Sequence, residues 1–137
     1  MAIHYIQEDR KIPVKNRKSH KEWLTGVIKE EKRRVGVINY VFVSDNYLLK
    51  INRQFMKRDY LTDVISFNYG SEKVVAGDIL VSVDRVYENA DKFKVERNNE
   101  LDRIMVHGLL HLIGYEDTTK EEKSIMTQKE NYYLKKR

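Results

Sequence analysis

Two histidines stand four residues apart in the segment His107-Gly-Leu-Leu-His111-Leu-Ile-Gly-Tyr-Glu-Asp117. Residues at i and i+4 lie on the same face of a helix, one turn apart. Gly114 follows, where a helix can end and the chain can turn back. The acidic pair Glu116 and Asp117 comes directly after that turn. The segment therefore predicts a helix that carries two imidazoles on one face and a turn that returns a carboxylate to them.

This layout is typical of a metal ion held for chemistry. Two imidazoles and one carboxylate give three protein ligands and leave a position open, whereas a structural zinc usually takes four protein ligands. The chain contains no cysteine, so a metal here must be held by His, Asp or Glu. We predict a site for one divalent metal ion, such as Zn²⁺ or one of its neighbours, with His107, His111 and Asp117 as its ligands. Glu116 is the alternative third ligand, or a hydrogen-bond partner of a ligand histidine.

The residue after the first histidine decides between two kinds of hydrolysis. In zinc peptidases of the HExxH pattern this residue is a glutamate that acts as general base, and here it is Gly108. A bound metal can still polarise a phosphoryl oxygen, and RNA carries its own nucleophile in the 2′-hydroxyl. The pattern therefore favours cleavage of RNA, and a metal-dependent peptidase is the least favoured alternative.

The remaining sequence predicts one domain over residues 1–137, since a chain of this length fits one core. Alternating and β-branched runs predict strands at residues 2–7, 35–44, 64–69 and 74–83, and the last two are expected to form a hairpin. Helical spacing and caps predict a helix at residues 19–34, one that follows the cap at residues 44–46 and runs to residue 55, and one at residues 84–93. A fourth helix is predicted from residue 98 or 99 to residue 113, and a last one from residue 118 or 119. This order predicts an α/β (α+β) fold, a sandwich of helices on a small mixed sheet.

Some local features of these helices are also predicted. Ser19 with Glu22 has the pattern of a capping box at the start of the first helix, and Thr118 or Thr119, with Glu121 or Glu122, is expected to open the last one. His4 and His20 have no partner pattern and are predicted to lie at the surface. Tyr115 is predicted to pack beneath the turn that follows the metal helix.

The formal net charge of +5 is concentrated in the first quarter of the chain. Residues 1–34 hold ten Lys/Arg and five Asp/Glu, whereas the remaining residues hold sixteen of each. A basic surface attracts polyanions such as RNA or an anionic membrane, although the same residues also suit a solvated helix face. We predict that this surface contributes salt-dependent affinity for RNA.

Two absences bear on location. No apolar run approaches the roughly 20 residues that span a bilayer. The first residues do not have the basic start and apolar stretch of a signal peptide. We therefore expect a cytoplasmic protein without a membrane partner.

The histidine segment resembles the signature HGxLHLxGYDH of the YbeY family, the bacterial rRNA maturation factors. Three further segments agree with the family pattern, and the similarity runs from about residue 48 to 117. Residues 51–52 and 59–67 resemble its LN and D-x-PTDVLSF elements, residues 77–79 resemble its GDI, and Glu100 with Leu101 precedes the metal helix as in the family.

This resemblance implies an α/β sandwich with a zincin-like metal helix and the three ligands in a cleft. It implies a metal-dependent, zinc-containing endoribonuclease that acts on single-stranded RNA in 16S rRNA 3′-end maturation and ribosome quality control. The implied partners are rRNA and the small ribosomal subunit, with ribosome-associated proteins as further candidates and no DNA. The alternative that stays open is a non-catalytic ribosome-assembly or RNA-binding factor whose metal site is mainly structural.

Two positions depart from the family pattern. Its third ligand is a histidine where this chain has Asp117, and an anionic ligand would make the metal a weaker Lewis acid. A family arginine, which helps to hold or activate the scissile phosphate, aligns with Met56. Arg53, one helical turn earlier, and Arg58 are candidates to supply that charge. We therefore predict His111, Arg53 and Arg58 as catalytic residues.

Overall fold

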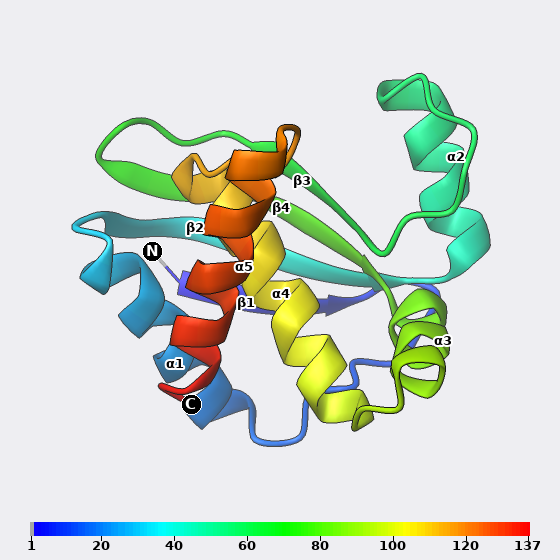
Figure 1. The fold of residues 1–137 in the computed structure, drawn as a ribbon, viewed down its shortest axis with the longest axis horizontal. Coiled ribbons are helices and arrows are strands. Elements are labelled where there is room, and N and C mark those ends of the chain that lie inside the picture. The colour runs from blue at the N-terminus through cyan, green and yellow to red at the C-terminus, as the bar shows by residue number, and fades with distance from the viewer. Residues whose placement is uncertain (1) are drawn as a thin grey trace.

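Four strands form one sheet with the spatial order β1-β2-β4-β3 in the computed structural model, which describes residues 2–137 (Figure 1). The strands are β1 (Ala2–Gln7), β2 (Arg34–Val43), β3 (Val64–Asn68) and β4 (Val74–Ser82). The helices are α1 (Arg17–Glu30), α2 (Asp45–Phe55), α3 (Val83–Phe93), α4 (Arg97–Ile113) and α5 (Lys120–Leu134). The predicted order of elements and the α/β fold class are confirmed.

The sheet is mixed, as expected. Strands β1, β2 and β4 run parallel to one another, and β3 pairs with β4 as an antiparallel hairpin. The two edges of the sheet are therefore β1 and β3, which lie at opposite sides of the molecule. The predicted hairpin is confirmed. The order of the other strands is a result of the structure, because local sequence pattern does not tell which distant strands pair.

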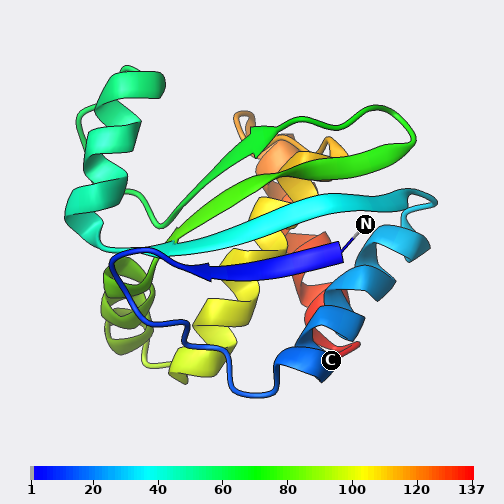
Figure 2. The ribbon, with the colours of Figure 1, turned by 180° about the vertical axis from the view of Figure 1, so that it is seen from behind.

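Helices cover both faces of the sheet, though unequally. Successive side chains of a strand point to opposite faces. In β4, Ile79 and Val81 join the main core with α1, α3, α4 and α5, whereas Leu80 joins a smaller cluster with Leu48 of α2. Figure 2 shows the strands in front of α4 and α5, with α2 set apart from these helices near one end of the sheet.

Helix α4 is the centre of the main core, and it approaches the sheet closely at Gly108. A Cβ at this position would lie 2.7 Å from Cγ2 of Ile79, so glycine is what allows the close approach. The Ser66 hydroxyl of β3 donates to the Gly108 carbonyl at 3.0 Å. This contact sets the end of α4 that carries His107 and His111 beside the β3 edge of the sheet.

Two local predictions are wrong. The first helix begins at Arg17 rather than Ser19, its cap is Asn16, and it has no side-chain cap. The Ser19 hydroxyl donates instead to the Asn16 carbonyl, which is a contact within the first turn. His20 is not a surface residue, because its ring lies between the Tyr5 hydroxyl and the Asp102 carboxylate with 12% of the side chain exposed.

Other local predictions are confirmed. Of the residues expected to open the last helix, Thr119 is the cap of α5 and forms a full capping box with Glu122. His4 is exposed. Within residues 2–137, every helix is too short or too polar to cross a bilayer.

Candidate metal centre

The loop after α4 returns the chain to the helix, as the sequence pattern predicts. Gly114 ends α4 with a φ of 123°, a left-handed value that favours glycine. Its N–H donates to the carbonyls of Leu110 and His111, and the Tyr115 N–H also donates to Leu110. These bonds close the last turn and direct the following residues back over α4. We call residues 114–119 the metal loop.

Three donor atoms converge where the metal loop meets α4. Nε2 of His107 lies 3.1 Å from Nε2 of His111, and Oδ2 of Asp117 lies 3.2 Å from the first and 3.4 Å from the second. Tetrahedral zinc with bonds of about 2.0–2.1 Å holds its ligand atoms about 3.3–3.4 Å apart. The three atoms therefore fit an ion of this size, and Asp117 rather than Glu116 completes the group.

The other ring nitrogen of each histidine, Nδ1, is within hydrogen-bonding distance of a protein oxygen. Nδ1 of His111 lies 2.9 Å from the carbonyl oxygen of Tyr115, and Nδ1 of His107 lies 2.5 Å from Oε2 of Glu130. A carbonyl oxygen only accepts, so Nδ1 of His111 carries the proton, and an ionised Glu130 places it on Nδ1 of His107 in the same way. Both Nε2 atoms then carry a lone pair, and both lie within 3.4 Å of Oδ2 of Asp117. This is the tautomer that binds a metal.

Glu130, on α5, is the functional residue that sequence reasoning missed. It is 7% exposed, and its other oxygen accepts from Nη1 of Arg103 at 2.8 Å. Burial lowers the pKa of His107, but the hydrogen bond and the charge of Glu130 outweigh this, and the pKa is raised overall. One signal was available in the sequence, since Glu130 shares the buried face of α5 with Met126 and Tyr133.

A second carboxylate anchors the metal loop. Glu31, the residue after α1, accepts from the Tyr115 hydroxyl at 2.6 Å, from Lys129 Nζ at 3.0 Å and from the Tyr133 hydroxyl. Burial raises the pKa of Glu31, but these hydrogen bonds lower it by a larger amount. The pKa of Glu31 therefore lies below its usual value. Tyr115 thus packs beneath the turn, as predicted. Its backbone carbonyl is thereby held within hydrogen-bonding distance of Nδ1 of His111.

The donor group opens into a cleft of about 490 Å³. One wall is the β3 edge, and the other walls are the connection from α2 to β3 and the metal loop. Arg58 and Met56 line this cleft, and so does Glu116. Arg53 is absent from the lining residues and pairs with Asp59 at an exposed position. Of the two predicted arginines, the structure therefore brings Arg58 into the cleft with the metal-binding group.

A further carboxyl, that of Asp63, lies in the cleft. Burial raises the pKa of Asp63 more than the charge of nearby His107 lowers it. Its backbone carbonyl accepts from the Ser82 N–H at 2.9 Å, which fixes the turn into β3. Asp63 thus shapes the entry to the strand that forms one wall of the cleft.

The fold and the site define a class of protein: an α/β sandwich in which two histidines of a buried helix and a carboxylate from the next loop face an open cleft. The family described as Endoribonuclease YbeY matches residues 2–137 of this chain. The chain belongs to that family.

Individual relatives agree with this assignment. The Endoribonuclease YbeY of Flavobacterium psychrophilum is 46% identical over 122 residues, which are 89% of this chain and 87% of the relative. That of Parabacteroides distasonis is 39% identical over 134 residues, which are 98% and 94% of the two chains. The solution structure of TM1509 from Thermotoga maritima matches with a TM-score of 0.66 and 33% identity, and covers 96% of this chain and 86% of that one.

Proposed function

We propose that this protein is a metal-dependent endoribonuclease with zinc as its ion. Its substrate is single-stranded rRNA at the 3′ end of 16S rRNA, and it acts in rRNA maturation and ribosome quality control in the cytoplasm, in contact with the small ribosomal subunit. The observation that supports this most is the triangle of three donor atoms, 3.1–3.4 Å apart, that opens into a cleft. The relatives named as endoribonucleases support the choice of RNA.

Each residue has a defined part in this proposal. His107 and His111 would hold the ion, and Asp117 would add a negative charge that lowers the net charge of the occupied site. When bound, the ion supplies positive charge that polarises a phosphoryl oxygen. The Arg58 guanidinium lies in the same cleft and binds phosphate oxygens. It replaces the family arginine, whose position is occupied by Met56 in this chain. The substrate's 2′-hydroxyl serves as the nucleophile.

Peptide hydrolysis is the weaker alternative, because the residue after the first histidine is Gly108 rather than a glutamate. A glutamate at this position would supply the general base of a zinc peptidase. In this chain the position lies against Ile79 and Ser66, in contact with the sheet. A side chain here would meet the sheet before it reached the cleft, so the position is structural.

The experiment that tests this function uses one preparation in two states. Protein stripped of metal by a chelator should not cleave a single-stranded RNA with the sequence of the 16S rRNA 3′ end, and added Zn²⁺ should restore cleavage. Equal cleavage before and after stripping would indicate a contaminating nuclease. Binding of the RNA by both states without cleavage by either would favour the non-catalytic assembly factor.

The third ligand can be tested separately from activity. Asp117→Ala should lower zinc affinity by more than about 100-fold, the upper end of what loss of an outer-sphere partner alone causes. Asp117→His, which places the histidine of the family pattern at this position, should retain high affinity. Both are measured by competition with a zinc-binding dye. Unchanged affinity of the alanine variant would remove Asp117 from the ligand set and direct attention to Glu116.

A further inference from the structure

The cleft has too little positive charge to bind RNA tightly by itself. Among its described lining residues, Arg58 is the sole Lys or Arg, whereas Asp63, Glu116 and Asp117 are acidic. A divalent ion would offset these acids but would leave little excess charge. Affinity for single-stranded RNA comes largely from neutralised phosphates, with bases resting on flat or apolar surface. A strand in the cleft therefore needs a basic surface beyond it.

A groove of about 920 Å³ between α1 and the β1 edge has that character. We call it the α1 groove. Among the described residues that line it, Glu22 is the one acid, and the basic side chains outnumber it. These are Lys18, Lys21, Lys29, Arg33 and Arg34.

The pattern of α1 explains this groove. Its buried face carries Trp23, Leu24, Val27 and Ile28. Residues 18, 21, 25 and 29 follow at steps of three and four, so they form one stripe along the helix, and this stripe borders the groove. Ala2 of β1, which is exposed, and Val35 of β2, which is half-buried, add apolar surface, on which a nucleobase can rest. The groove thus combines phosphate-binding cations with apolar surface for bases.

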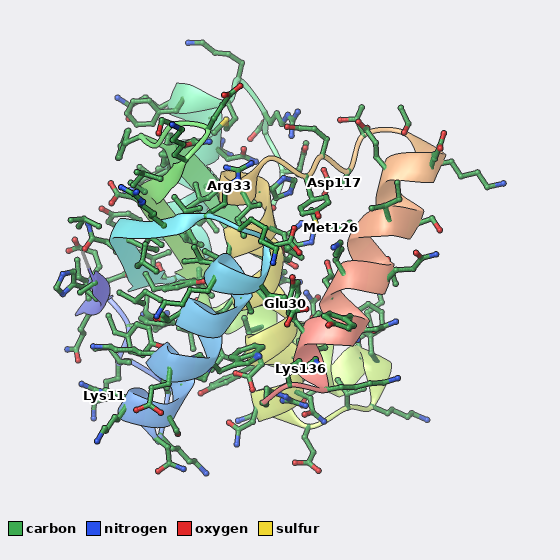
Figure 3. The ribbon with its side chains drawn as sticks, turned by 90° about the vertical axis from the view of Figure 1, so that its left-hand side faces the viewer. Lys11, Glu30, Arg33, Asp117, Met126 and Lys136 are labelled. Carbon is green, nitrogen blue, oxygen red and sulfur yellow. The ribbon has the colours of Figure 1, made fainter. Side chains whose placement is uncertain are left out.

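Arg33 connects the α1 groove to the metal loop. Its Nη2 donates to the carbonyl of Ile113, the last residue of α4, at 2.8 Å. Arg33 also lines a smaller hollow of about 250 Å³ with Gly114, Tyr115 and Glu31, whose charge is paired with that of Lys129. The next two residues of the chain, Glu116 and Asp117, line the cleft. In Figure 3, Arg33 and Asp117 lie at the same end of the molecule, and Lys11 and Lys136 lie at the other.

We propose that single-stranded RNA held in the cleft continues past Arg33 into the α1 groove, where lysines bind its phosphates. This inference rests on the proposed function and adds the path of the substrate outside the metal site. It also gives a function to basic residues of the segment 1–34, which line the α1 groove and do not line the cleft. The protein should therefore bind a long strand more tightly than one that fills the cleft alone.

The test compares oligouridines of about 5 and about 20 nucleotides, a range that brackets single-strand site sizes. Binding to the metal-loaded protein is measured by fluorescence anisotropy over a range of salt concentrations. The variant Lys18→Gln/Lys21→Gln/Lys29→Gln should bind the long RNA at least tenfold more weakly, and the slope of log affinity against log salt should fall by about 2, since each contact contributes about 0.7. Affinity for the short RNA should stay unchanged.

A matched control removes the same charge elsewhere. The variant Lys92→Gln/Lys94→Gln/Lys135→Gln changes three exposed lysines that line neither the cleft, the hollow nor the α1 groove. It should bind the long RNA as the wild type does. Equal losses in both triple variants would show an effect of net charge alone and would overturn the proposal. So would a wild type that binds both RNAs with equal affinity, a result that would leave the groove to an acidic protein partner.

Failure of this path is distinguishable from failure of the proposed function. Cleavage of the short RNA by saturating protein depends on the metal centre and should be the same in wild type and groove variant. Cleavage of the short RNA together with no effect of groove substitutions on long RNA would overturn the path alone. Absence of any metal-dependent cleavage would count against the enzyme, while the binding data would still decide the path.

Discussion

Replacing His111 by alanine should abolish RNA cleavage and lower zinc affinity by more than about 100-fold. His111 supplies one of the three donor atoms, and its Nε2 lies within 3.4 Å of the two others. Its ring is oriented by the Tyr115 carbonyl, so no neighbouring side chain replaces it without a change in the metal loop. An ion left with two protein ligands would be bound weakly and would be lost on dilution. The two measurements are cleavage of the short RNA and competition with a zinc-binding dye.

The matched control is His4→Ala, which removes an exposed imidazole that lines the α1 groove and lies outside the cleft, which is the part that the short RNA fills. It should cleave the short RNA at the wild-type rate. Circular dichroism of both variants establishes that they are folded, since His111 is half-buried on a helix that belongs to the core. Wild-type cleavage by folded His111→Ala protein would exclude the metal centre from the reaction and would contradict the proposed function.

The part of the site that could be predicted lies within one short segment. The spacing of His107 and His111 sets their relation through helix geometry alone, and Gly114 permits the reversal that returns Asp117. None of this depends on how α4 packs against the rest of the protein. The element order and the fold class were predictable for a similar reason, because periodicity and turn residues act locally.

The parts that were missed depend on contacts between distant segments. Glu130 reaches His107 because α5 packs along α4, and no local pattern specifies that packing. His20 has the residue context of a surface position, yet packing of α1 against α4 and β1 places it between Asp102 and Tyr5. The expected box at Ser19 failed because the helix starts earlier, at Arg17, so that Ser19 lies within the first turn. Tertiary structure decides such choices.

The arginines show an intermediate case. Arg53 and Arg58 are both near the position of the missing family arginine in sequence, and helical spacing gives an argument for Arg53 alone. Arg53 lies in the last turn of α2 and pairs with Asp59. Arg58 follows Lys57, whose φ of 56° turns the chain after α2, and it lines the cleft with the metal-binding group. The backbone turn at Lys57 thus directs Arg58 into the cleft and leaves Arg53 outside it. Sequence spacing alone does not reveal this turn.

Replacing Glu130 by glutamine should lower zinc affinity by about 10- to 100-fold, the usual effect of losing a partner of a ligand histidine. This corresponds to about 1.4–2.8 kcal/mol. The amide is nearly the size of the carboxylate, so the substitution removes the negative charge that holds Nδ1–H of His107 and pairs with Arg103. The effect should be smaller than that of His111→Ala, because all three donor atoms remain.

A purely structural role for Glu130 would give a different result. It would lower the melting temperature of the metal-free protein without changing zinc affinity, because the carboxylate would only join α4 to α5 through Arg103. Glu130→Asp keeps the charge on a shorter side chain and should recover part of the affinity if the charge matters to His107. The exposed Glu121, on the same helix, provides the control Glu121→Gln, which should bind zinc as the wild type does. Unchanged affinity in Glu130→Gln would limit this residue to packing, and a graded loss from aspartate to glutamine would establish that α5 supports the metal centre.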